Sequence, residues 1–144
     1  MTNAEEIFAG RLSVMARMQA EHNDEVHPDW LNQGFEYYRA VWVECAELLD
    51  HFGWKWWKKQ IADIEQVKLE IVDIWHFGLS DLIRDDLVGA DLAREMVQRA
   101  ESKGDGDFRQ AVEALANRAL DDPKFHVASF IDVLNALPMS LDEL

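Results

Sequence analysis

The sequence predicts an all-α fold, an antiparallel bundle of helices in one domain. Apolar residues recur at the spacing of a helix face over most of the 144 residues, and the alternation typical of half-buried strands is not found. Glycines and prolines separate the helical stretches. Apolar residues make up 49% and charged residues 29% of the chain, which is the composition of a globular protein. We therefore expect residues 1–144 to form a single domain around one core.

The first half of the chain predicts three helices. Residues 5–21 carry spaced apolar side chains among polar ones, and residues 23–32, which include a proline, predict a connection. Residues 34–52 predict a long helix with one apolar stripe. A third helix is predicted over 63–83, and because its centre is apolar almost all round, we expect it to be buried.

The second half predicts three shorter helices. Residues 88–102 and 108–120 have the pattern of amphipathic helices, and the two glycines within 103–107 predict a loop between them. A last helix is predicted over 125–137, where Pro138 ends it. The sequence therefore predicts a bundle whose longest and most apolar helices lie in its first half.

The charge and cysteine content exclude several classes of protein. With 28 acidic side chains against 14 Lys and Arg, the formal net charge is −14, which argues against broad binding to nucleic acid. One cysteine, Cys45, cannot form an internal disulfide and fits a reducing compartment. No apolar run is long enough to span a membrane, and Glu5 and Glu6 do not fit a secretory signal. We therefore expect a cytoplasmic protein without nucleic-acid or membrane partners.

Two pairs of carboxylates stand three residues apart on predicted helices, Glu44 with Glu47 and Glu70 with Asp73. Three residues are nearly one turn, so each pair shares a helix face. Such pairs are common in an acidic chain, and most belong to a solvated face. Here, however, no Lys or Arg stands three or four residues from any of the four acids, where it would share their helix face. A positive charge is therefore expected to come from outside these helices.

A hard divalent cation, Mg²⁺ or Mn²⁺, is the partner that carboxylate oxygens favour. The 22 residues between Glu47 and Glu70 include Gly53, which leaves room for a turn and an antiparallel return. We therefore expect the two acidic faces to meet across the bundle. A di-iron centre is the weaker alternative, because it requires two Glu-x-x-His motifs and the sequence offers only Asp73-x-x-His76.

Four motifs follow one another between residues 18 and 80. They are Met18-Gln19 followed by Asn23 and Trp30, then Glu44-Cys45-Ala46-Glu47-Leu48-Leu49, Trp54-Lys55-Trp56-Trp57-Lys58, and Glu70-Ile71-Val72-Asp73-Ile74-Trp75-His76-Phe77. In these motifs the chain resembles the dimeric all-α dUTPase family of the nucleoside triphosphate pyrophosphohydrolases, which is related to the MazG-type enzymes. The carboxylate motifs are shared across that superfamily, whereas the tryptophan–lysine block is more specific to the dUTPase branch.

The resemblance implies Mg²⁺-dependent hydrolysis of dUTP to dUMP and pyrophosphate by a homodimer, with Mn²⁺ as a possible substitute. It implies that Glu44, Glu47, Glu70 and Asp73 hold the metal that bridges the phosphates. Metals offset the charge of a triphosphate and activate the attacking water. Among these carboxylates, we expect Glu44 to orient or deprotonate that water.

The resemblance also implies four contacts to the nucleoside. Gln19 and Asn23 are similar to the family's amide contacts to the base, and amides can satisfy both donors and acceptors on a uracil edge. Phe77 matches the aromatic side chain that packs against the base, and His76 lies beside it near the sugar. Without the resemblance, Gln19 would be an ordinary surface residue and Phe77 an ordinary core residue.

The cationic part of the predicted site is sparse. Lys55 and Lys58 are similar to the family's triphosphate contacts, although lysines on a loop are often plain surface charges. The family commonly continues into a segment rich in Asn, Arg, Gln, Lys and Gly-Tyr that closes over the phosphates. Residues 125–144 contain neither Arg nor Lys. We therefore expect the domain to lack this segment, either as a shortened member or because the chain stops before it.

Two alternatives to a dUTP diphosphatase remain at this point. The first is a related pyrophosphohydrolase that prefers dCTP or another deoxynucleoside triphosphate, because only the base contacts would differ. The second is a catalytically silent helical interaction protein of the same fold, which would keep the bundle but bind no metal.

Overall fold

The computed structural model describes residues 1–104 and 106–144, and this part of the chain is helical with no strand. The elements are two short 3-10 helices and six α-helices: α1 (Asn3–Val26), η1 (Trp30–Asn32), α2 (Tyr37–Phe52), α3 (Ile64–Arg84), α4 (Ala90–Glu101), α5 (Phe108–Asp121), α6 (Val127–Ala136) and η2 (Leu141–Glu143). The predicted all-α bundle is confirmed.

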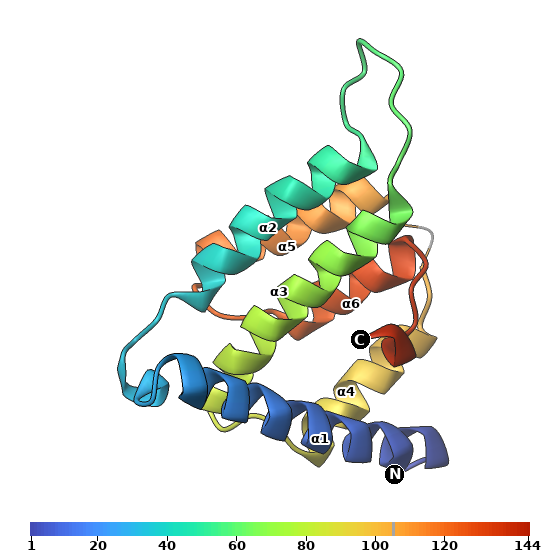
Figure 1. Cartoon of the computed structure of the whole chain (residues 1–144). Helices are drawn as coiled ribbons and strands as arrows, with labels where there is room; N and C mark the ends of the chain where they lie inside the picture. The colour runs from blue at the N-terminus through green and yellow to red at the C-terminus, as the bar shows by residue number, and fades with distance from the viewer. Residues whose placement is uncertain (105) are drawn as a thin grey trace.

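The helices form a bundle around α3. Helix α2 runs antiparallel beside α3 and also packs on α5, while α6 lies against α5 and α4 (Figure 1). Helix α1 crosses the far end of α3 and packs along α4 (Figure 1). Within the described residues, no helix is long and apolar enough to cross a membrane.

The apolar pattern of the sequence explains why α2 and α3 pair. Helix α2 buries one stripe, Val41, Cys45 and Leu48, as its single apolar face predicts. Helix α3 buries much of its surface between Val67 and Leu82 but exposes a stripe of Leu69, Asp73 and His76, so its apolar centre predicted more complete burial than the structure shows. Because both helices leave one side open to solvent, polar groups on their shared edge lie at the surface of the core.

One predicted connection was wrong in its first residues. The sequence predicted a connection over 23–32, but α1 continues through Val26 before it ends. Asn23 stays helical because its side chain bonds to neighbouring side chains and does not compete for the backbone. The helix ends at His27, whose extended backbone is typical of a residue that precedes a proline.

The remaining boundaries agree with the predictions to within three residues. In the predicted loop over 103–107, Gly104, Gly106 and Asp107 are not helical, and Asp105 lies outside the described residues. The Asp107 side chain accepts a hydrogen bond from the Gln110 backbone N–H at 3.2 Å, which caps the start of α5.

The segment between α2 and α3 forms a long loop that projects from the end of the bundle (Figure 1). Gly53 ends α2 with a φ of +99°, in the region that glycine adopts more readily than other residues. The Gln60 side-chain oxygen accepts hydrogen bonds from the backbone N–H groups of Trp54 and Lys55, at 3.0 and 2.6 Å. These bonds close the base of the loop, because they join its outgoing segment to its returning segment.

Candidate active site

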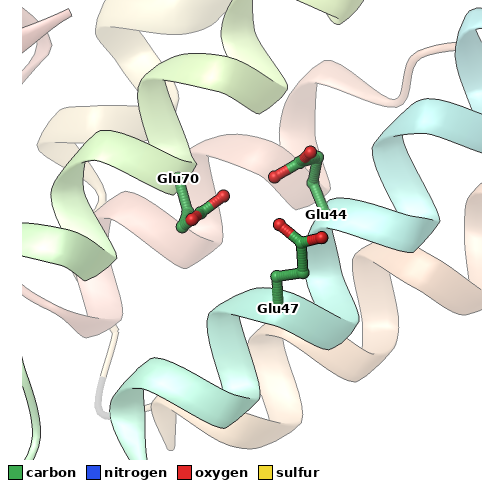
Figure 2. A group of neighbouring side chains, drawn as sticks. All are labelled: Glu44, Glu47 and Glu70. Atoms are coloured by element: carbon green, nitrogen blue, oxygen red, sulfur yellow. The ribbon is translucent and has the colours of Figure 1, made fainter.

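Three carboxylates meet between α2 and α3. Glu44 and Glu47 project from one face of α2, and Glu70 projects from α3 toward them (Figure 2). One oxygen from each carboxylate lies within 4.8 Å of the others, so the three can serve as ligands of one cation. Because Glu44 and Glu47 are three residues apart, a single helix turn brings both to the same face.

The cluster is electrostatically costly when it holds no cation. Burial, together with the nearby Glu70 and Glu47, raises the pKa of Glu44 to about 8. The Glu44 atom Oε2 is buried and has no hydrogen-bond partner within the described residues. Hydrogen bonding to Glu44 lowers the pKa of Glu70, although burial acts in the opposite direction. The two carboxyls therefore share one proton at neutral pH, with Glu44 as the group that carries it.

Two further residues hold Glu70 in place, and the sequence analysis missed both. The Gln66 Nε2 atom donates to Glu70 Oε1 at 3.0 Å, and His51 Nε2 lies 3.6 Å from the same oxygen. Glu70 itself is buried, with 6% of its surface exposed. The signal for both was present in the sequence, since Gln66 is one turn before Glu70 and His51 is one turn after Glu47.

Asp73, the fourth predicted ligand, is not part of this group of three carboxylates. It lies one turn beyond Glu70 on α3, and its side chain is exposed. Desolvation and the charge of Glu70 raise the pKa of Asp73, while His76 lowers it. Asp73 thus lies within the electric field of the cluster, on the side that faces His76.

A chain of polar side chains lies further along α3, where α1 crosses it. The Gln19 Oε1 atom is 2.6 Å from His76 Nδ1, and Gln19 Nε2 donates to Asn23 Oδ1 at 2.9 Å. Asn23 Nδ2 in turn donates to the hydroxyl of Ser80 at 2.9 Å. The structure therefore brings together three of the predicted substrate residues and adds Ser80, which the sequence analysis did not single out.

A cavity of about 500 Å³ opens beside this polar chain. Its polar lining is Gln19, His22 and His76. Its apolar wall includes Met15, Trp75 and Leu79. An apolar cavity with a few converging polar groups is the usual form of a small-molecule site. The cavity therefore suits a flat ring that presents hydrogen-bonding atoms on one edge.

The other predicted residues lie apart from this chain. Phe77 is half-buried and packs against the core. The Lys55 Nζ atom lies 6.0 Å from the centre of the Trp54 ring, and Lys58 is exposed on the same loop. Cys45 is buried in the core, and burial raises the pKa of its thiol to about 12, so it is no nucleophile.

Comparison with known families identifies the chain. A family model described as dUTPase matches residues 11–144, which is nearly the whole sequence. The chain belongs to the all-α dUTPase family. A separate comparison with individual curated proteins finds no match. The resemblance seen in the sequence motifs is therefore confirmed over a much longer part of the chain than those motifs cover.

Membership of this family makes the chain a dUTP diphosphatase, a nucleoside triphosphate pyrophosphohydrolase. The dUTPase match favours dUTP hydrolysis over the two alternatives, a dCTP-preferring relative and a silent interaction protein. The family typically uses a divalent metal, and the three carboxylates of Figure 2 form a group that can bind one.

Proposed function

We propose that this dUTPase hydrolyses dUTP to dUMP and pyrophosphate with Mg²⁺ held by Glu44, Glu47 and Glu70, and with Asp73 completing the metal site. One observation carries the proposal: three carboxylates from two helices converge within 4.8 Å, although none of them pairs with a Lys or Arg in the part of the chain that the structure describes. An all-oxygen ligand set suits a hard cation such as Mg²⁺, and Mn²⁺ is the natural substitute.

The buried oxygen of Glu44 supports a cation in this position. A buried carboxylate oxygen without a partner is costly, and a metal ligand bond would satisfy it. When bound, such an ion offsets the charge of the triphosphate and activates the attacking water. The residues present therefore fit the group that the family typically uses.

Each carboxylate has a role that follows from its surroundings. Glu70, held by Gln66 and His51, is the fixed ligand on α3. Glu44 lies within reach of both Glu47 and Glu70. A cation bound there would displace the proton that Glu44 holds in the metal-free protein, and the freed carboxylate could then take a proton from water. We propose that Glu44 accepts this proton while water attacks phosphorus, the bond between the α- and β-phosphates breaks, and pyrophosphate leaves.

The order of groups along α3 matches the order of groups in a nucleotide. The lysine-bearing loop precedes α3, the carboxylates lie near its start, and the polar chain lies further along it. His76 is six residues beyond Glu70, which is about 9 Å along a helix axis. We propose that Lys55 and Lys58 bind the outer phosphates, and that Gln19, Asn23, His76 and Phe77 bind the base and sugar.

We propose further that the chain acts as a homodimer in a reducing compartment such as the cytoplasm. The projecting loop exposes Trp56 and Ile61 at 85% and 86% of their surface, which is unusual for a monomeric protein. The single cysteine is buried and unpaired, as it would be in a reducing compartment. The acidic net charge of −14 favours a small-molecule substrate over nucleic acid.

The test is pyrophosphate release from dUTP, dCTP, dTTP, dATP and UTP with Mg²⁺ and with the metal removed by a chelator. We expect turnover of dUTP that depends on the metal, and its loss in Glu47→Gln. Exposed Glu113 on α5 gives the matched control, since Glu113→Gln should retain full activity. Turnover that survives both chelation and Glu47→Gln would overturn the metal site.

A further inference from the structure

Ser80 lies at the end of the polar chain that joins α1 to α3, and the donor and acceptor of each of its hydrogen bonds can be assigned. It is buried, with 1% of its surface exposed, and its hydroxyl donates to the backbone carbonyl of His76 at 2.9 Å. A carbonyl oxygen can only accept, so this bond uses the single hydrogen of the hydroxyl. The Ser80 oxygen is then left as an acceptor, and Asn23 Nδ2 fills that position.

The direction of the rest of the chain follows from this bond. Because Asn23 turns its NH₂ group toward Ser80, its carbonyl oxygen faces Gln19 and accepts from the Gln19 NH₂ group. Gln19 is nine-tenths buried and must then present its own carbonyl oxygen to His76 Nδ1, at 2.6 Å. An acceptor at this distance requires a proton on Nδ1.

The opposite direction is possible for each amide alone but makes one bond fewer. If Ser80 donated to Asn23, both amides and His76 could reverse, and the bond from Ser80 to the His76 carbonyl would be lost. The direction drawn above is therefore the one in which every group of Ser80 is satisfied.

We propose that Ser80 is a positioning residue of this dUTPase: it sets the direction of the chain and holds neutral His76 with its proton on Nδ1, so that Nε2 is an acceptor toward the substrate. This deepens the proposed role of Gln19, Asn23 and His76 in nucleoside binding and rests on it. His76 is exposed at the cavity, and Nε2 has no partner within the described residues. A bare acceptor selects a ligand that offers an N–H or O–H donor there, such as N3–H of uracil, which cytosine lacks.

The test is the tautomer of His76, measured from its imidazole nitrogen shifts by ¹⁵N NMR on the full chain above neutral pH. We expect Nδ1 to be protonated in the wild type, and Ser80→Ala to move a substantial part of the population to the Nε2-protonated form. Ser102→Ala is the matched control, because Ser102 also donates to a backbone carbonyl but holds no side chain, and it should leave the signal unchanged. His76 is assigned from the signal that His76→Gln removes.

A second measurement ties the tautomer to substrate choice. Ser80→Ala should lower kcat/KM for dUTP relative to dCTP on the order of tenfold, mainly through KM, since a hydrogen bond to the base is lost. A wild-type His76 that is protonated on Nε2, or a folded Ser80→Ala variant with unchanged tautomer, would overturn the proposal. An inactive wild type with the expected tautomer would instead contradict the proposed function and leave the hydrogen-bond chain intact.

Discussion

Glu44 carries the electrostatic strain of the metal-free protein, and its removal should stabilise the fold. Its pKa rises from 4.5 to about 8 on folding, chiefly through burial, so above pH 4.5 the folded state holds a proton that the unfolded state has released. The free energy of unfolding of the metal-free chain should therefore fall as pH rises from 4.5 to 8. Glu44→Gln keeps a donor for Glu70 and removes this dependence.

We expect Glu44→Gln to stabilise the chelator-treated protein by about 1 kcal/mol at neutral pH, which raises Tm by about 3 °C, and by less in mild acid. Thermal unfolding at both pH values measures this, with Glu113→Gln, an exposed acid on α5, as the control. If Glu44→Gln lowered Tm by the same amount at neutral pH and in acid, the ionised Glu44 carboxylate would not destabilise the folded protein.

Metal binding should depend on the same proton. A cation that binds Glu44 must displace the proton that the carboxyl holds below pH 8. The affinity for Mn²⁺ should therefore rise about tenfold per pH unit up to about pH 8 and then level off. Isothermal titration calorimetry in two buffers of different ionisation enthalpy counts the protons released, and we expect about one per bound cation. Binding without proton release at neutral pH would contradict the shared proton.

At the scale of the elements, α3 is positioned by a close approach to the segment that joins α5 and α6. A Cβ atom on Gly78 would lie 2.5 Å from the ring of Phe125, which packs at a tilt against the stacked rings of Trp75 and Phe130. This ring cannot move without displacing its neighbours, so a methyl group at Gly78 would push α3 outward.

Gly78→Ala should therefore destabilise the protein by about 1–3 kcal/mol and also lower activity, because Glu70 and His76 lie on the same helix. Gly10→Ala on α1 is the matched control, since a Cβ there meets nothing within 4 Å. That change should stabilise the helix by up to about 1 kcal/mol. Chemical denaturation of both variants measures the difference, and equal effects would contradict the close approach at Gly78.

The helices of this protein could be predicted from local signals, because the apolar period of α2 and α3 reflects the faces they bury. The end of α1 could not be predicted from local signals. Asn23 suggested a connection by its usual preference for turns, but its side chain is engaged by Ser80, 57 residues away in the sequence. A contact of that kind depends on how α1 crosses α3, which no local pattern encodes.

The candidate site divides in the same way. The one-turn spacing of Glu44 with Glu47 and of Glu70 with Asp73 predicted that two acidic faces meet. The structure brings together Glu44, Glu47 and Glu70, and Asp73 is not part of that group. Gln66 and His51 follow the same one-turn spacing and were within reach of that argument. The polar chain of Gln19, Asn23, His76 and Ser80 was only partly visible, because its geometry arises where two distant helices meet.

On the scale of the whole molecule, the projecting loop is the feature that a monomer leaves unexplained. Trp54, Trp56 and Trp57 lie edge to face on one another, and two of them are more than half exposed. The loop is nevertheless anchored, since Gln60 closes its neck and Arg109 of α5 donates to the Gly53 carbonyl at 2.7 Å. An anchored loop with clustered tryptophans has the composition of an interface core.

If this loop lies in the interface of a homodimer, Trp56 should be among the residues that hold the two copies together. Buried tryptophans dominate many interfaces, so Trp56→Ala should raise the dimer dissociation constant more than about tenfold. Sedimentation equilibrium measures that constant, and Leu120→Ala, which removes an exposed apolar side chain from α5, should leave it unchanged. A wild type that stays monomeric at all concentrations would exclude the dimer. A dimer that tolerates Trp56→Ala would place the interface on another face. The proposed role of the loop would then be limited to binding the phosphates of the substrate with its lysines.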